Sequence, residues 1–253
     1  MQWPQGCAPE GLQVEVLQAG DGREVSTGAA VLAQYTGYVW GSDTPFDSSF
    51  ERGAPATFSL NGVVPGWSEG IPGNVVGSRL LISIPPELGY GEAGNPQAGI
   101  AGTDTIVFVV DIMETYNDDD AGEEDAAVAE SAPAGIDISG APGEPATIAV
   151  GTGAAEPTEV VVTPLTSGSG ASVEVGQNLV MAYALDYWDD TASESTWAGE
   201  TVAQGPIVTQ IGSGSVLDAL AGRTTVGSRV LVLIPGDEVG PAAVVVLDVL
   251  GTS

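Results

Sequence analysis

The sequence contains no histidine, no lysine and a single cysteine. Without histidine, the Ser-His-Asp and Cys-His arrangements of nucleophilic catalysis cannot form, and an ordinary zinc site is excluded. With Cys7 alone, no disulfide can close within the chain. We interpret Cys7 as a free thiol near the terminus; a lipidated cysteine behind a removed signal segment is the alternative. We expect no metal and no cofactor.

Positive charge is also scarce, because 5 arginines stand against 34 aspartates and glutamates, and the formal net charge is −29. Such a chain repels phosphate groups, which excludes nucleic acids and anionic membranes as partners. No stretch approaches the ~18 apolar residues of a membrane span. The opening MQWPQGCAPEG lacks the features of a signal peptide. We expect a cytoplasmic protein if Met1 is the native start, and an extracytoplasmic or cell-envelope protein if a signal segment was trimmed.

The chain divides at an acidic segment. Residues 117–135 hold seven acids followed by Ala, Ser, Pro and Gly, a composition typical of an extended, solvated linker. A calcium loop at residues 117–120 is the alternative, although the alternating acidic order of an EF-hand loop is missing. We predict four parts: an N-terminal tail (1–8), a first domain (9–116), an acidic linker (117–133) and a second domain (134–253).

The two domains repeat one another. The clearest matches are VGSR (76–79 and 226–229) and VFVVDIM with VVVLDVL (107–113 and 244–250). The interval between these two matches is 13 residues shorter in the second copy. The second copy therefore lacks a loop, which in the first copy contains GYGEAGNPQAGIAG.

Short runs of β-branched and aromatic residues, bounded by Gly, Pro and Asp, predict antiparallel strands at VLAQYTGYVW, SRLLISI and TIVFVVDIM. The segment VVPGWSEGIPGN differs, because Trp67 and Ile71 follow a proline and lie four residues apart, which indicates a short amphipathic helix. The predicted fold class is α+β and mainly β. We expect two domains, each a curved antiparallel sheet wrapped around one short helix.

The first copy resembles the FKBP family of peptidyl-prolyl cis/trans isomerases. PFDSSFERG, FSLNGVVPGWSEGI and VGSRLLISIPPELGYGEAG follow one another in the family's order, within about residues 9–116. The second copy is similar only in its framework, and its lead-in resembles the additional N-terminal strands of tandem bacterial members. The resemblance implies an isomerase that acts on X-Pro bonds of client polypeptides, as a monomer, with macrolides as inhibitors.

The resemblance also implies the site residues. Asp47 and Tyr90 are the expected catalytic groups at the rim of a pocket, and Arg52 is expected to hold Asp47 in place. The expected pocket, with Trp67 as its floor and the Val64 N–H as a donor to substrate, is formed by Tyr35, Phe46, Phe58, Val63, Val64, Trp67, Ile100 and Phe108.

This chemistry needs no histidine. Rotation about a peptide bond faces a barrier of ~18–20 kcal/mol, which a dry pocket lowers by favouring the twisted amide over the planar one. Taken singly, however, Trp67 and Phe108 also fit an ordinary core, and FDSS fits an Asx turn. The sequence also departs from the family, because Ile100-Ala101-Gly102 replaces its Ile-Pro-Pro flap and Ala56 replaces an aromatic wall residue of some members.

The second copy has lost these residues. Aromatic residues fall from 11 in residues 1–116 to 4 after them. The counterparts of Trp67, Phe46, Asp47 and Arg52 are Leu217, Ser193, Glu194 and Gly199. We predict a non-catalytic second domain. For the whole protein, the alternatives to an isomerase are a chaperone or protein-binding module with little turnover, and a structural spacer.

Overall fold

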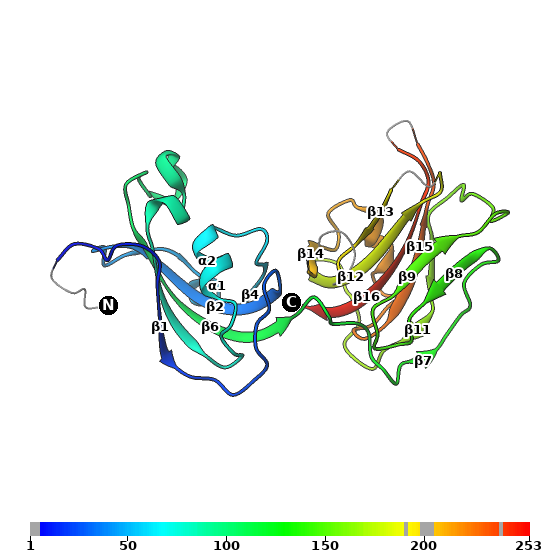
Figure 1. Ribbon diagram of the computed structural model, residues 1–253, viewed down its shortest axis with the longest axis horizontal. Coiled ribbons are helices and arrows are strands. Elements are labelled where there is room, and N and C mark those ends of the chain that lie inside the picture. The colour runs from blue at the N-terminus through cyan, green and yellow to red at the C-terminus, as the bar shows by residue number, and fades with distance from the viewer. Residues whose placement is uncertain (1–5, 190–191, 198–204, 238–239) are drawn as a thin grey trace. The chain divides into compact units, whose positions relative to one another are not determined.

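The computed structural model describes residues 6–189, 192–197, 205–237 and 240–253. The chain folds into two compact units, Met1–Thr115 and Tyr116–Ser253 (Figure 1). Residues 1–5 of the predicted tail and Gly199 lie outside the described residues. In the described part of the chain, no helix combines the length and the apolar character needed to cross a membrane.

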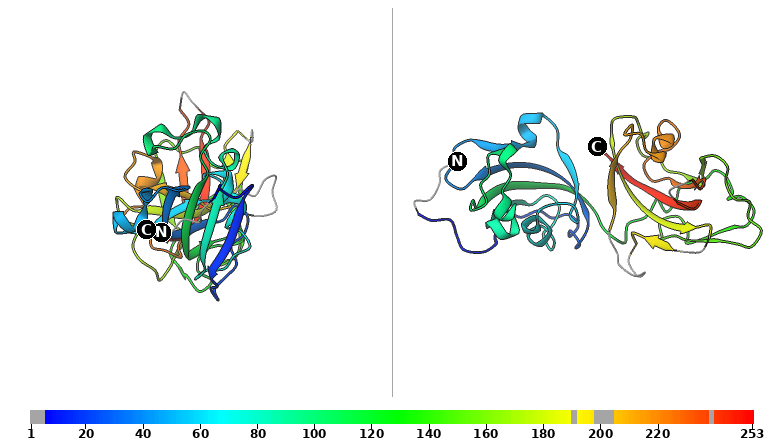
Figure 2. Two further views of the ribbon diagram at one scale, coloured as in Figure 1. Left: turned by 90° about the vertical axis from the view of Figure 1, so that its left-hand side faces the viewer. Right: turned by 90° about the horizontal axis from the view of Figure 1, so that it is seen from above.

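The first unit is a six-stranded sheet in the order β1-β5-β6-β2-β3, with β4 also paired to β2. Its strands are β1 Gln13–Gln18, β2 Ala30–Val39, β3 Pro45–Ser48, β4 Ala56–Ser59, β5 Arg79–Ile84 and β6 Ile106–Tyr116. Its helices are α1 Ser49–Arg52 and α2 Pro65–Gly70, with short 3-10 turns η1 Pro86–Leu88, η2 Gly91–Ala93 and η3 Pro96–Ala98. Figures 1 and 2 show long, curved strands, with α2 on the concave side of the sheet.

The core of the first unit lies between α2 and this concave side. Strand alternation brings Val31, Ala33 and Tyr35 of β2 to the same face, and all three are buried. Every second residue of β6 joins them, from Ile106 to Ile112. Helix α2 adds Trp67, which is 4% exposed. The predicted strands and short helix are therefore present, and the predicted fold class is confirmed.

The second unit repeats this topology, with a main sheet in the order β10-β15-β16-β12-β13 and β14 paired to β12. A 3-10 turn, η4, takes the place of α2. The bounds are β7 Ala127–Val128, β8 Ile136–Ser139, β9 Thr147–Val150, β10 Val161–Pro164, β11 Thr166–Ser167, β12 Asn178–Tyr187, β13 Ser193–Ser195, β14 Ile207–Gln210, η4 Val216–Leu220, β15 Arg229–Ile234 and β16 Ala243–Thr252.

Unlike the first sheet, the second sheet is buried on both faces. The β8–β9 hairpin packs on the face opposite η4, where Ile138 and Ile148 contact the buried side chains of Leu231, Val244 and Val246. Figure 1 shows the β8–β9 hairpin beside the main sheet, near β15. As a result β15 and β16 are buried almost continuously, whereas β5 and β6 include exposed positions.

The segment predicted as a solvated linker, residues 117–133, is instead tied to the second unit. The Gly122 N–H donates to Asp248, the Glu123 carboxylate accepts from Ser169, and the Asp120 carbonyl accepts from the Trp197 indole N–H. Strand β7 also pairs with β11. The dense acidic run suggested repulsion and extension, but its backbone N–H and C=O groups find partners far along the chain.

Candidate functional site

Helix α2 places the large side chain of Trp67 against the sheet. Pro65 occupies the first helical position, where its missing N–H costs nothing, and the carbonyl of Val64 accepts from the Trp67 N–H at 2.9 Å. Gly66 lets the helix approach closely, since an added Cβ would lie 2.5 Å from a methyl group of Ile84. In the described chain the Val64 N–H itself has no acceptor.

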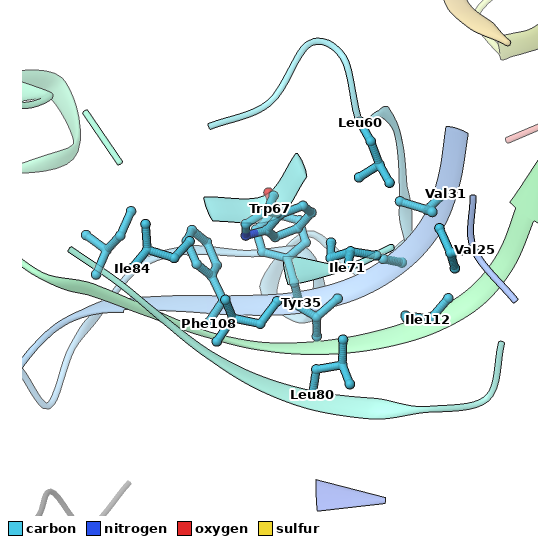
Figure 3. Packing of buried hydrophobic residues seen from close by; sticks show 14 of the residues in the cluster. Val25, Val31, Tyr35, Leu60, Trp67, Ile71, Leu80, Ile84, Phe108 and Ile112 are labelled. Atoms are coloured by element: carbon cyan, nitrogen blue, oxygen red, sulfur yellow. The ribbon is translucent and has the colours of Figure 1, made fainter. Parts of the chain in front are cut away.

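An open aromatic cavity of about 290 Å³ lies beside this helix. The Trp67 ring makes edge contacts with three other aromatic rings, at centroid distances of 5.4 Å to Tyr35, 5.2 Å to Phe58 and 5.2 Å to Phe108. Figure 3 shows Trp67 between its helix and the strands that carry Tyr35 and Phe108. The full lining is Tyr35, Phe46, Asp47, Phe58, Gly62, Val63, Val64, Trp67, Tyr90 and Phe108.

Gly37 makes room for two of these rings. A Cβ added at Gly37 would lie 2.6 Å from the Phe108 ring and 2.7 Å from the Phe46 ring, distances that real contacts essentially never show. With glycine there, Phe46 and Phe108 meet edge to face at 5.5 Å. The sequence analysis did not single out Gly37, although the glycine inside the strand QYTGYV was a signal for close approach.

Asp47, Arg52 and Tyr35 form one polar network at the cavity rim. The Arg52 guanidinium is ion-paired with one oxygen of Asp47, and the Tyr35 hydroxyl donates to the other at 2.5 Å. Arg52 also donates to the Tyr35 oxygen at 2.7 Å and lies over its ring. The sequence analysis placed Tyr35 only as a wall, so the polar role of its hydroxyl is a finding of the structure.

Burial raises the pKa of Tyr35 to about 12, and the hydrogen bond to Asp47 adds to the effect. A negative phenolate is disfavoured away from water and next to a carboxylate, more than Arg52 compensates. Because the folded-state pKa exceeds the unfolded value of ~10, this contribution to stability is complete below pH ~10 and is lost as the pH rises through 12.

We expect a late tyrosine to be visible in a spectrophotometric pH titration of the folded protein. Of the six tyrosines, Tyr35 should ionise near pH 12, and Tyr35→Phe should remove that step. Tyr183, whose pKa is also raised, stays as an internal control. If Tyr35→Phe left the latest step unchanged, the assignment would be wrong.

The loop after β5 brings Tyr90 to the cavity, where its side chain is 37% exposed. A second depression of about 290 Å³ shares Phe46, Asp47 and Tyr90 with the cavity and continues along Asn95, Gln97 and Ala98. Ile100 does not line the cavity: it is 3% exposed and packs in the core beneath the loop. The backbone of Ile100 forms an isolated antiparallel bridge with Asn95.

The second unit keeps only part of this arrangement. The Tyr183 hydroxyl lies 3.3 Å from Glu194, as Tyr35 lies beside Asp47. Leu185 occupies the position of Gly37, so a side chain fills the space that Gly37 leaves for two rings. Val245 stands in the register position of Phe108. Leu217 packs against the core.

Among the described residues, no group of three or more Asp, Glu or Cys side chains is arranged to hold a metal ion. In the segment of the calcium alternative, the Asp120 carboxylate instead accepts from the Asn117 N–H at 2.8 Å. The arrangement in the first unit is thus an aromatic cavity with polar groups at its rim.

Comparison with known proteins identifies the family to which the first unit is similar. The family model described as FKBP-type peptidyl-prolyl cis-trans isomerase matches residues 21–113, within the first unit. A probable FK506-binding protein of Corynebacterium glutamicum is 40% identical over 115 residues, which cover 45% of this chain and 94% of that relative. The chain belongs to the FKBP-type peptidyl-prolyl cis-trans isomerase family.

Longer relatives are matched in part. The isomerase FkpA of Escherichia coli K12 is 38% identical over 125 residues, which are 48% of this chain and 45% of FkpA. The crystal structure of FkpA from Escherichia coli is 39% identical, covers 42% of this chain and 48% of that chain, and has a TM-score of 0.39. The chain therefore spans about half the length of FkpA.

Proposed function

We propose that the first unit catalyses cis-trans isomerisation of X-Pro bonds in other polypeptides. The aromatic cavity carries this proposal, because its six aromatic side chains enclose a space suited to one small ring. Its volume lies at the low end of the range for ligand pockets, which favours a proline side chain over a larger molecule. The residues around the cavity would determine which client sequences are preferred.

The catalytic principle is desolvation and positioning. The planar amide is held by resonance that separates charge, and water stabilises that polar form. Moving the X-Pro bond to a dry aromatic pocket removes this stabilisation and favours the twisted amide. Lowering the barrier by ~5–7 kcal/mol corresponds to about four to five decades in rate. No covalent intermediate and no proton transfer are required.

The rim groups would hold the substrate. The Val64 N–H is free to donate to a substrate carbonyl, and the Tyr90 hydroxyl reaches the same cavity. Asp47, fixed by Arg52 and Tyr35, presents a carboxylate of constant orientation. The neighbouring depression along Asn95 and Gln97 would accept the residue next to proline.

We propose that the second unit does not catalyse this reaction. Leu185 fills the space that two rings use in the first unit, and Val245 and Leu217 replace the other walls. The loop that carries Tyr90 has no counterpart. The remaining Tyr183–Glu194 pair lacks an aromatic enclosure and a guanidinium comparable to that of Arg52 within the described residues.

The test is NMR exchange spectroscopy on an Ala-Leu-Pro-Phe peptide with the full chain. Catalysis should broaden or exchange the cis and trans signals. Asp47→Ala should lower kcat/KM at least about tenfold, and Tyr90→Phe about 2–10-fold, the range that one hydrogen bond supplies. Asp21→Ala, an exposed acid outside the cavity, is the matched control.

Two outcomes separate the alternatives. If the peptide binds the folded chain without exchange, the first unit is a binding module or chaperone. If Asp47→Ala and Tyr90→Phe both retain full activity, the catalytic roles given to these residues are wrong even though the activity is real.

A further inference from the structure

The outer face of the first sheet, defined here as the side opposite α2, carries Arg79, Leu81, Val109, Asp111 and Met113. Alternation along β5 and β6 turns these side chains away from the core, since the residues between them are buried on the inner side. Arg79 donates to Asp111 at 2.5 and 2.6 Å. The two side chains are 49% and 25% exposed.

The same pair is covered in the second unit. Arg229 donates to Asp248 at 2.7 and 2.8 Å, but these side chains are only 4% and 0% exposed. The turn of the β8–β9 hairpin closes over them. Its carbonyl oxygens at Gly140, Ala141 and Glu144 accept from the outer guanidinium nitrogens at 2.8, 3.2 and 2.5 Å.

The β8–β9 hairpin contacts the sheet through aliphatic side chains. Ile136, Ile138, Ile148 and Val150 alternate with exposed residues and face the sheet. The carboxylate of Asp248 receives one further backbone N–H, from Gly122. In the second copy, the guanidinium group of Arg229 thus binds the hairpin turn, and the aliphatic outer face of the sheet packs against β8 and β9.

The first copy has the same arginine, carboxylate and aliphatic outer face, but within the described chain they bind no hairpin. Within the described chain, Arg79 has no acceptor beyond Asp111. Leu17 and Phe50, which correspond in position to Leu165 and Trp197, are 48% and 52% exposed. Their counterparts pack beneath the hairpin. Met113 on the outer face is 46% exposed.

We propose that the outer face of the first sheet is a docking site for a β-hairpin of a partner polypeptide. The hairpin would be seated as β8–β9 is seated on the second sheet, with turn carbonyls accepting from Arg79 and aliphatic residues on Leu81 and Val109. A neutral or basic hairpin is favoured, because the chain carries a net charge of −29. This site is separate from the aromatic cavity and independent of its activity.

The test uses a head-to-tail cyclised peptide of residues 135–151 with Asp137→Asn, a change on its exposed side that reduces repulsion. Cyclisation is needed because an isolated hairpin is marginally stable. Titrated into the isotope-labelled full chain, it should shift the amide signals of residues 79–81 and 109–113 saturably. Arg79→Gln should weaken binding at least about tenfold, since it removes charged donors.

The controls are Arg23→Gln, which removes the same charge from another exposed arginine of the first unit and should bind normally, and a peptide with Ile138→Asp, which should not bind. Shifts confined to residues 229–248, or equal affinity in Arg79→Gln, would overturn the proposal. So would concentration-dependent shifts of residues 79–81 without peptide, since a second copy of the chain would then cover this face.

Discussion

A Trp67→Leu variant is expected to lose at least about nine-tenths of its kcat/KM on proline peptides. Leucine is the residue that the second copy carries at this position, and it cannot reach the three rings that Trp67 contacts. Water would then enter the cavity and stabilise the planar amide, which removes the source of the rate enhancement. Exchange spectroscopy on the full chain measures the loss directly.

Stability has to be separated from activity in this variant. Truncating a buried aromatic residue costs about 2–4 kcal/mol, somewhat less than replacement by alanine. Leu80→Ala is the matched control, because Leu80 is fully buried in the same core but does not line the cavity. It should lose similar stability and keep its kcat/KM at low temperature. Equal activity losses in both variants would mean that Trp67 acts through the fold alone.

Arg229→Gln should destabilise the second unit by about 3–5 kcal/mol, whereas Arg79→Gln should change the first unit by at most about 1 kcal/mol. Arg229 is buried, and its loss leaves the Asp248 carboxylate buried without its cation and three carbonyls without donors. The Arg79–Asp111 pair is half exposed, so water replaces the lost partner.

Thermal unfolding followed by NMR signals of each unit distinguishes the two variants. The midpoint of the second unit should fall by about 10 °C in Arg229→Gln, as expected for a unit of this size. Adding Asp248→Asn should restore part of the loss, because no uncompensated charge then remains. A midpoint in Arg229→Gln as high as in Arg79→Gln would contradict the role given to the buried pair.

Local sequence patterns were sufficient for the strands and the short helix of the first unit. The runs around Tyr35 and Phe108 are rich in β-branched and aromatic residues, and Pro65 precedes apolar residues at helical spacing, so each element forms for a reason contained in a few neighbouring residues. The prediction that these elements form a cavity depended on the family resemblance. Of the ten cavity-lining residues, nine were among those it implied, and Gly62 is the exception.

The features that escaped prediction rest on contacts between distant residues. The acidic segment gives no local sign that Gly122 will reach Asp248, 126 positions away. Ile100 was assigned to the cavity by the family resemblance, whereas in the structure it is buried in the core. The Tyr35 hydroxyl bonds to Asp47 through the pairing of β2 with β3, which apolar patterning does not reveal.

The place of the central strand in the sequence of each unit affects the order in which the two units can fold during synthesis. In both units the strand that completes the sheet is the last one in sequence, β6 in the first and β16 in the second. A nascent chain can thus complete its first unit early, whereas the β8–β9 hairpin can pack only after Arg229 and Asp248 have been synthesised. At about 5–20 residues per second, roughly 140 residues take about 7–28 s to synthesise. During that interval we expect the ribosome to carry a folded first unit attached to an unfinished second unit.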